Sequence, residues 1–145
     1  LWDGKLRRVV ATLEGFPQSQ EGTWDRDATF SPDGRLLAVA ATGKSIQVWQ
    51  PETKRELWRA DSGARSLAFA PDSKTLVTAD WEDASIKVWN ASSGELLKTL
   101  KGATVAIPPG CWSQGSVAYA PDGRTFATAV GGAEKKGVRV PTLLT

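Results

Sequence analysis

The sequence has 145 residues, the length of one ordinary domain, of which 41% are apolar and 23% are charged. That composition is typical of a globular protein and excludes a disordered or collagen-like chain. The 18 basic and 16 acidic side chains are mixed along the sequence and leave a net charge of +2. The charge pattern therefore predicts neither nucleic acid nor a membrane surface as a partner.

Cysteine content and hydropathy narrow the class further. Cys111 is the only cysteine, so no disulfide can form within the chain. There is no apolar run of the roughly 18 residues that a membrane-spanning helix needs, and the N-terminal residues lack the apolar stretch of a signal peptide. Because the chain starts at Leu1 and contains no Met, we expect both ends to be internal to a longer protein.

From the N-terminus, strands that end in tryptophan recur along the chain, at Trp2, Trp49 and Trp89. The last two are the fifth residues of the hexapeptides SIQVWQ at 45–50 and SIKVWN at 85–90. Both hexapeptides alternate apolar and polar residues with the two-residue period of a β-strand. Two nearly identical strands at a fixed offset predict a repeated structural unit.

A second repeated signal is a Pro-Asp turn, which reads FSPDGR at 30–35, FAPDSK at 69–74 and YAPDGR at 119–124. Each turn follows an aromatic residue and precedes an apolar strand. Proline fixes φ, aspartate caps the turn and glycine allows a positive φ, which is hairpin chemistry. The residues of this signal are Pro32, Asp33, Pro71, Asp72, Pro121 and Asp122.

In the middle of the chain these signals predict strands near 54–60, 65–70, 75–80 and 85–90. Four short strands in about 40 residues is the spacing of one β-propeller blade. The third strand of the last unit is expected at GVRV, residues 137–140, although Pro141 follows it where a tryptophan is expected.

The endings LWD, VWQ and VWN, in register with the Pro-Asp turns, resemble those of the WD-repeat β-propellers. The resemblance implies an all-β fold, with four-stranded antiparallel blades forming a partial ring of about three repeats. Residues 1–145 would then be one propeller segment with units at about 4–50, 51–90 and 91–141. It also implies an assembly platform or recognition module.

The sequence departs from this family in the polar residues that join the strands of a blade. Many members carry a Gly-His pair, but this chain has no His. The middle unit keeps Thr78, Asp83 and Trp89 of the associated network, whereas the preceding unit has Val39 and Gly43 in place of the first two. We therefore expect apolar packing to hold these blades more than that network does.

Nearly all differences in loop length fall on one predicted face. That face carries FPQSQEGTWDRD (16–27), ADWEDAS (79–85), ATVAIPPGCWSQG (103–115) and VGGAEKKG (130–137). Tryptophans among charged, Pro and Gly residues suit a recognition surface. The predicted partner-binding residues are Trp24, Asp25, Arg26, Trp81, Glu82 and Trp112.

A structural alternative for these tryptophans stays open, in which the insertions fold back over the rim and the indoles fill local gaps. For Trp49 and Trp89, burial between blades is the expected role. Trp58, on an outermost strand, is expected to be half-buried edge packing.

Catalysis and metal binding find little support in the sequence. Without His, and with one Cys, no Ser-His-Asp or Cys-His arrangement and no imidazole or thiolate metal cage can form. The remaining acids could serve as a glycosidase pair or as Ca²⁺ ligands, but solvated turn residues are the simpler interpretation. These acids are Glu21, Asp25, Asp27, Asp80, Glu82 and Asp83.

We expect no enzyme activity, no metal and no cofactor. The sequence predicts a non-catalytic scaffold that binds a protein or peptide, and not nucleic acid or membrane. The alternative function is a regulatory or substrate-positioning part of a larger enzyme whose active site lies elsewhere. Because propellers have about 4 to 8 blades, the remaining blades would come from missing sequence or from a second copy.

Overall fold

The computed structural model of the chain describes residues 1–3, 5, 8–9, 12, 27–41, 45–80, 85–101, 114–131 and 142–144. Within these ranges the regular secondary structure is strand and turn, without a helix, as the all-β prediction requires. Accordingly, the described residues contain no helix long and apolar enough to cross a membrane.

Two four-stranded antiparallel sheets form the centre of the molecule, and in both of them the spatial order follows the chain order. The strands of the first sheet are β3 (Asp27–Phe30), β4 (Leu37–Ala41), β5 (Ser45–Gln50) and β6 (Arg55–Asp61). Those of the second sheet are β7 (Ala64–Phe69), β8 (Thr75–Asp80), β9 (Ser85–Asn90) and β10 (Leu96–Lys101).

Two smaller sheets flank this pair along the chain. The third sheet has the order β11-β12-β13, and its strands are β11 (Gln114–Tyr119), β12 (Phe126–Gly131) and β13 (Thr142–Leu144). At the N-terminus, β1 (Trp2–Asp3) and β2 (Arg8–Val9) form a two-stranded antiparallel hairpin.

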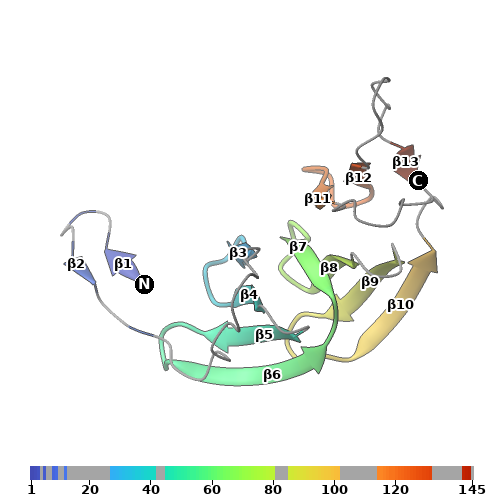
Figure 1. Ribbon diagram of the computed structural model, residues 1–145. Helices are drawn as coiled ribbons and strands as arrows, with labels where there is room; N and C mark the ends of the chain where they lie inside the picture. Colours follow the sequence, from blue (N-terminus) through green and yellow to red (C-terminus); the bar gives the residue numbers. More distant parts are fainter. Residues whose placement is uncertain are drawn as a thin grey trace.

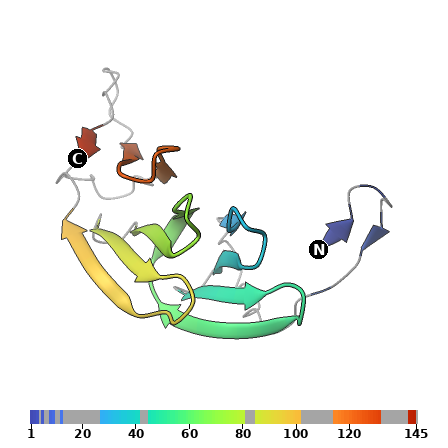
Figure 2. The ribbon, with the colours of Figure 1, turned by 180° about the vertical axis from the view of Figure 1, so that it is seen from behind.

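The sheets follow one another along an arc rather than forming a closed ring (Figure 1). The first strands β3, β7 and β11 lie on its concave side, and the outermost strands β6 and β10 lie on its convex side. The view from behind has the same arrangement (Figure 2). β7 packs beside both β3 and β11, so the second sheet lies between the other two.

The Pro-Asp turns close by hydrogen bonds of one kind. In each turn the Asp Oδ1 accepts the N–H two residues on, at 2.9 to 3.0 Å, as from Arg35 to Asp33. The Ser31 hydroxyl donates to Asp33 at 2.6 Å and, with the Arg35 N–H, holds the pKa of that carboxyl below its usual range. Gly34 and Gly123 take a positive φ, and Ser73 takes the same conformation in the second sheet.

Apolar side chains fill both spaces between neighbouring sheets. β8 serves both spaces, because Leu76 belongs to the cluster facing the first sheet and Val77 to the cluster facing the third. Alternate side chains of a strand point to opposite faces, so a strand enclosed on both sides needs apolar residues throughout. Leu76 and Val77 are fully buried, which is worth about 1.5 to 3 kcal/mol for each.

The grouping of strands into sheets differs from the sequence-based grouping by one strand. Strands do form at all four positions expected for the middle unit, but β6 pairs with β5 of the first sheet. The reason is the short turn at 51–54, which makes β5 and β6 a hairpin. After β6 the chain passes through Ser62 and Gly63 into β7 of the next sheet. The predicted unit boundaries at 4–50, 51–90 and 91–141 stay predictions.

Among the described residues, the third strand of the third sheet is β13, which follows Pro141. The expected strand at 137–140 is outside the described residues, and the strand that pairs with β12 is β13. Leu144 stands opposite Phe126, as Trp89 stands opposite Leu76. Leu144 therefore holds the register position that tryptophan holds in the complete sheets.

Candidate interaction surface

The short turns lie together on one side of the arc, here called the turn rim. The Asp33 N–H donates to Ser73 Oγ over 3.2 Å, which links the Pro-Asp turns of two sheets. The Ala91 N–H donates to the Lys74 carbonyl over 2.9 Å, which brings the β9–β10 turn to the same place. Successive connections of an antiparallel sheet alternate between its two ends.

The opposite side is therefore where the segments of variable length join the strands. We call it the insertion rim, and it consists of the strand ends that border residues 10–26, 42–44, 62–63, 81–84, 102–113 and 132–141.

Asp80, at the insertion rim, is held by a buried polar cluster. Its Oδ2 accepts hydrogen bonds from the Gly63 N–H at 3.0 Å and the Ser62 hydroxyl at 3.4 Å, and pairs with Lys87 Nζ at 3.0 Å. The Asp80 side chain is only 4% exposed, so the interpretation as a solvated turn acid is wrong for this residue. A buried carboxylate has to be paired in this way to be tolerated.

Gly63 is required by the same cluster. A Cβ at this position would lie 2.5 Å from Asp80 Oδ1, closer than any real side chain comes. The glycine thus lets the backbone approach the carboxylate and donate to it.

The buried tryptophans of the two complete sheets use different acceptors. In the second sheet, Trp89 Nε1 donates to Thr78 Oγ1 at 3.0 Å. In the first sheet Val39 takes the place of Thr78, and Trp49 Nε1 donates to Gln47 Oε1 at 3.3 Å. Fully buried Gln47 thus supplies a polar partner that the expected blade network does not include.

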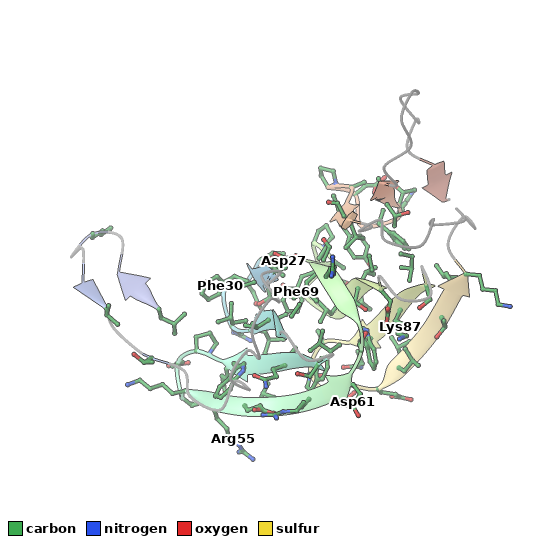
Figure 3. The ribbon with its side chains drawn as sticks, viewed as in Figure 1. Asp27, Phe30, Arg55, Asp61, Phe69 and Lys87 are labelled. Carbon is green, nitrogen blue, oxygen red and sulfur yellow. The ribbon has the colours of Figure 1, made fainter. Side chains whose placement is uncertain are left out.

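Side chains of the first strands link neighbouring sheets. Asp27 Oδ2 accepts the Leu67 N–H at 2.9 Å, and Ser66 Oγ accepts the Val117 N–H at 3.1 Å. Asp27 and Ser66 hold the same register position, opposite Ala40 and Ala79. Asp27, in β3 beside β7 in Figure 3, is therefore a link between sheets and not a solvated loop acid.

Trp58 also joins two sheets. Its ring stacks on Trp89 with centroids 6.0 Å apart, and its Nε1 donates to the Ala91 carbonyl at 2.9 Å. A Cβ at Gly94 would lie 2.6 Å from the Trp58 ring, so the turn closes directly over it. Trp58 is 9% exposed, which makes it more buried than the half-buried edge residue expected from sequence.

The repeated sheets agree with a comparison against family models. A model described as "WD domain, G-beta repeat" matches residues 10–50 and 54–90. The chain belongs to the WD-repeat family. The second matched range contains β6 to β9, so one WD repeat supplies the last strand of one blade and the first three of the next. The three sheets are accordingly called blades below.

WD-repeat relatives of this chain are longer proteins. The chain is 30% identical over 135 residues to the nuclear distribution protein PAC1 of Arthroderma benhamiae, covering 86% of the chain and 27% of that protein. It is 26% identical to the nuclear distribution protein nudF 1 of Talaromyces marneffei, over 70% of the chain and 22% of that protein. The transcriptional corepressor LEUNIG_HOMOLOG of Arabidopsis thaliana is 36% identical over 54% of the chain and 10% of its own length.

The predicted binding residues lie outside the part of the chain that the structure describes. These are Trp24, Asp25, Arg26, Trp81, Glu82 and Trp112, and Asp83 of the expected blade network lies outside it as well. The strands from which these segments leave are described, and Asp80 immediately precedes Trp81. Among the described residues, no group of three or more acidic, His or Cys side chains could hold a metal ion.

Proposed function

We propose that this WD-repeat segment is a non-catalytic scaffold that binds a protein or peptide through the insertion rim. The observation that carries the proposal is the division of the chain between two rims. The turn rim repeats the same short hydrogen-bonded turns, whereas the segments that differ in length and carry additional tryptophans leave from the insertion rim. Loops carried by a rigid sheet are the usual place for a binding site.

The base of the insertion rim is held by polar contacts in the second blade. Asp80 ties the end of β8 to Gly63 and to Lys87 of β9. A loop that starts from such a pinned base loses less conformational entropy when it binds. This supports a recognition role for Trp81 and Glu82, which follow Asp80 directly.

The printed names of the relatives are those of a nuclear distribution protein and a transcriptional corepressor. Neither name describes a catalysed reaction. From these names we carry over to this chain only a broad class of function, that of a protein that acts through interactions with other macromolecules. The partner of this chain is taken to be a protein or a peptide, and the chain to be one part of the propeller that presents the site.

The experiment is affinity capture from a lysate followed by titration of the captured partner. We expect the double substitution Trp24→Ala and Trp112→Ala to weaken binding by at least about tenfold, because aromatic anchors often carry 2 kcal/mol or more of binding energy. Arg35→Ala with Arg124→Ala, on the turn rim, is the matched control and keeps binding. Unchanged affinity in the tryptophan variant would overturn the proposal.

A further inference from the structure

The N-terminal hairpin has the register of the outer two strands of a blade. In it, Trp2 pairs with Val9, the residue seven positions further on. Trp49 of β5 and Trp89 of β9 pair at the same spacing with β6 and β10. β1 therefore corresponds to the third strand of a blade and β2 to the fourth. Among the described residues no strand pairs with the other edge of β1, so the hairpin lacks the two inner strands of its blade.

The third blade has the opposite deficiency, because its inner strands are present and its outer side is incomplete in the described part of the chain. No described strand pairs with the outer edge of β13. β13 pairs with β12 at three positions, whereas β5 and β9 each pair with the strand before them at five. Within the described residues, Ala129, Val130 and Gly131 of β12 pair only with β11. β13 therefore occupies only half of the edge that β12 offers.

Thr128 of β12 holds the position of a tryptophan acceptor. It corresponds in register to Thr78 of β8, whose Oγ1 accepts the Trp89 Nε1–H at 3.0 Å. In the third blade the residue at the tryptophan position, opposite Phe126, is Leu144, which has no side-chain N–H to donate. Thr128 is only 8% exposed, and no described side chain donates to its hydroxyl. The third blade thus has the acceptor of a blade tryptophan without the indole.

The face of the third blade that points away from the second blade is equipped for a following blade. Ser116 holds the register position of Asp27 and Ser66, whose side chains accept an N–H from the blade that follows them. Ser116 is exposed. Ala127 holds the position of Ala38, which is completely buried between the first and second blades, yet Ala127 is only partly buried. No described sheet covers this face.

The first blade has the complementary face, which is equipped for a preceding blade. Phe30 is 52% exposed at its end of the arc. Ala28 holds the register position of Leu67, whose N–H donates to Asp27 of the blade before it. Ala28 is exposed. One end of the arc therefore has the acceptor Ser116, and the other end has the matching backbone donor.

We propose that two copies of this chain exchange their N-terminal hairpins and thereby close a ring. The hairpin β1–β2 of one copy pairs with β12 of the other copy in place of β13. Trp2 then stands opposite Phe126, and its Nε1–H donates to Thr128 Oγ1. The result is a four-stranded blade of order β11-β12-β1-β2 that the two copies share, which is a form of domain swapping. The hairpin brings two strands and an indole, whereas β13 brings one strand and a leucine.

The arrangement of the chain favours a second copy as the occupant. The hairpin and the third blade lie at opposite ends of the arc (Figure 1, Figure 2), so their pairing requires a hairpin from another molecule. Because β2 leads into β3, the shared blade lies beside the first blade of the copy that donates the hairpin. There it covers Phe30 and brings Ser116 to the Ala28 N–H. Two complete blades from each copy and two shared blades make a ring of six, within the usual range of about 4 to 8.

The first test is the mass of the 145-residue chain in solution. Light scattering after size-exclusion chromatography is expected to give one species of about twice 15.5 kDa. A series of larger masses would overturn the proposal, because an exchange between two copies leaves no open end. A monomer would overturn it as well, in favour of a further segment of a longer protein or an unrelated partner at the open faces.

The second test is a disulfide between copies. Ala38 pairs with Val48 in the first blade, and the same register places Leu1 opposite Ala127 in the shared blade. With Cys111→Ser in every chain, Leu1→Cys and Ala127→Cys chains are mixed in urea, refolded and oxidised. The mixture is expected to give at least about tenfold more disulfide-linked dimer than either chain alone, because cysteines more than about 7 Å apart cannot be bridged. Leu1→Cys mixed with Ala38→Cys is the matched control, and equal cross-linking in that control would contradict the exchange.

The third test separates the hydrogen bond between copies from general stability. Trp2→Phe and Thr128→Val are each expected to raise the dimer dissociation constant by at least about fivefold, since a buried group loses its partner. The double variant is expected to do no more than the stronger single one, because both remove the same bond. Thr128→Ser keeps the acceptor, and Leu144→Ala affects only the displaced strand, so neither weakens the dimer. Circular dichroism checks that each variant is folded. Additive effects of the first two substitutions, or loss of the dimer in Leu144→Ala, would overturn the proposal.

Discussion

At the scale of single residues, the two complete blades use different side chains as the hydrogen-bond acceptor of their buried tryptophan. A buried indole N–H needs an acceptor, and the second blade supplies Thr78 where the first supplies Gln47. The two acceptors are not equivalent, because Gln47 Nε2 is buried without a hydrogen-bond partner among the described residues. The first blade therefore supplies an acceptor for its tryptophan, but within the described residues a donor of the same amide is unsatisfied.

Thr78→Val keeps the side-chain shape and removes the acceptor of Trp89. We expect a loss of about 1 to 3 kcal/mol in the free energy of unfolding, because a buried donor is left without its partner. Gln47→Leu is expected to cost less, since it also removes the unsatisfied amide. Urea unfolding followed by circular dichroism measures both. A larger loss for Gln47→Leu would contradict this account of the two blades.

Asp80 is expected to be among the most sensitive positions of the chain. Asp80→Ala leaves Lys87 and the Gly63 N–H without their buried acceptor, and removal of one member of such a pair typically costs about 3 to 5 kcal/mol. Asp80→Ala with Lys87→Leu should recover part of that loss. Asp61→Ala, which removes an exposed carboxylate, is the control. The midpoints of urea unfolding measure these losses. Equal midpoints for Asp80→Ala and Asp61→Ala would refute the stabilising role of the Asp80 carboxylate.

At the scale of elements, blades are aligned by hydrogen bonds between their first strands as well as by apolar packing. The acceptors Asp27 and Ser66 occupy one register position and bind the following blade at Leu67 and Val117. Apolar contacts tolerate small sliding, whereas a hydrogen bond to a backbone N–H fixes the register. These two links therefore set how each blade is aligned with the next.

Asp27→Ala is expected to increase amide hydrogen exchange at Leu67, and Ser66→Ala to do so at Val117. The respective losses of stability should be about 1.5 to 3 and about 1 kcal/mol, because the charged acceptor makes the stronger bond. The two effects should add, since they act at different interfaces. Asp27→Asn keeps an acceptor and is the control. Unaltered exchange at Leu67 in Asp27→Ala would argue against the link.

The sequence was sufficient to predict the strands, the turns and the repeat, because Pro-Asp chemistry and strand periodicity are local. The sequence did not show which strand pairs with β6. The same residues could form a hairpin with the preceding strand β5 or belong to the sheet of the following strands, and strand periodicity is identical in both cases. Asp80 and Asp83 look alike in the sequence, and only the approach of Gly63 and Lys87 identifies Asp80 as buried. In the sequence, Gln47 is indistinguishable from an ordinary polar strand residue, so its role as the acceptor of Trp49 could not be predicted.

At the scale of the whole molecule, the arc ends in one blade face at each end that no described sheet covers, and Phe30 lies on one of them. Phe30 ends β3 as Phe69 ends β7, in the same register position of its blade. Phe69 packs in the cluster between the first and second blades and is 6% exposed, whereas Phe30 is 52% exposed. In Figure 3 the two rings lie at successive places along the arc. Phe30 thus lies where a preceding blade would cover it.

The isolated 145-residue chain is therefore expected to self-associate through this face, and light scattering should give a mass above that of a monomer. An apolar ring left half in water drives association in proportion to the area that it can bury. Phe30→Ser should shift the mass toward the monomer without lowering the urea midpoint, because the ring makes little contribution to the core. Leu57→Ser is the control for general loss of surface hydrophobicity. A monodisperse wild-type monomer would mean that the open face needs no neighbour.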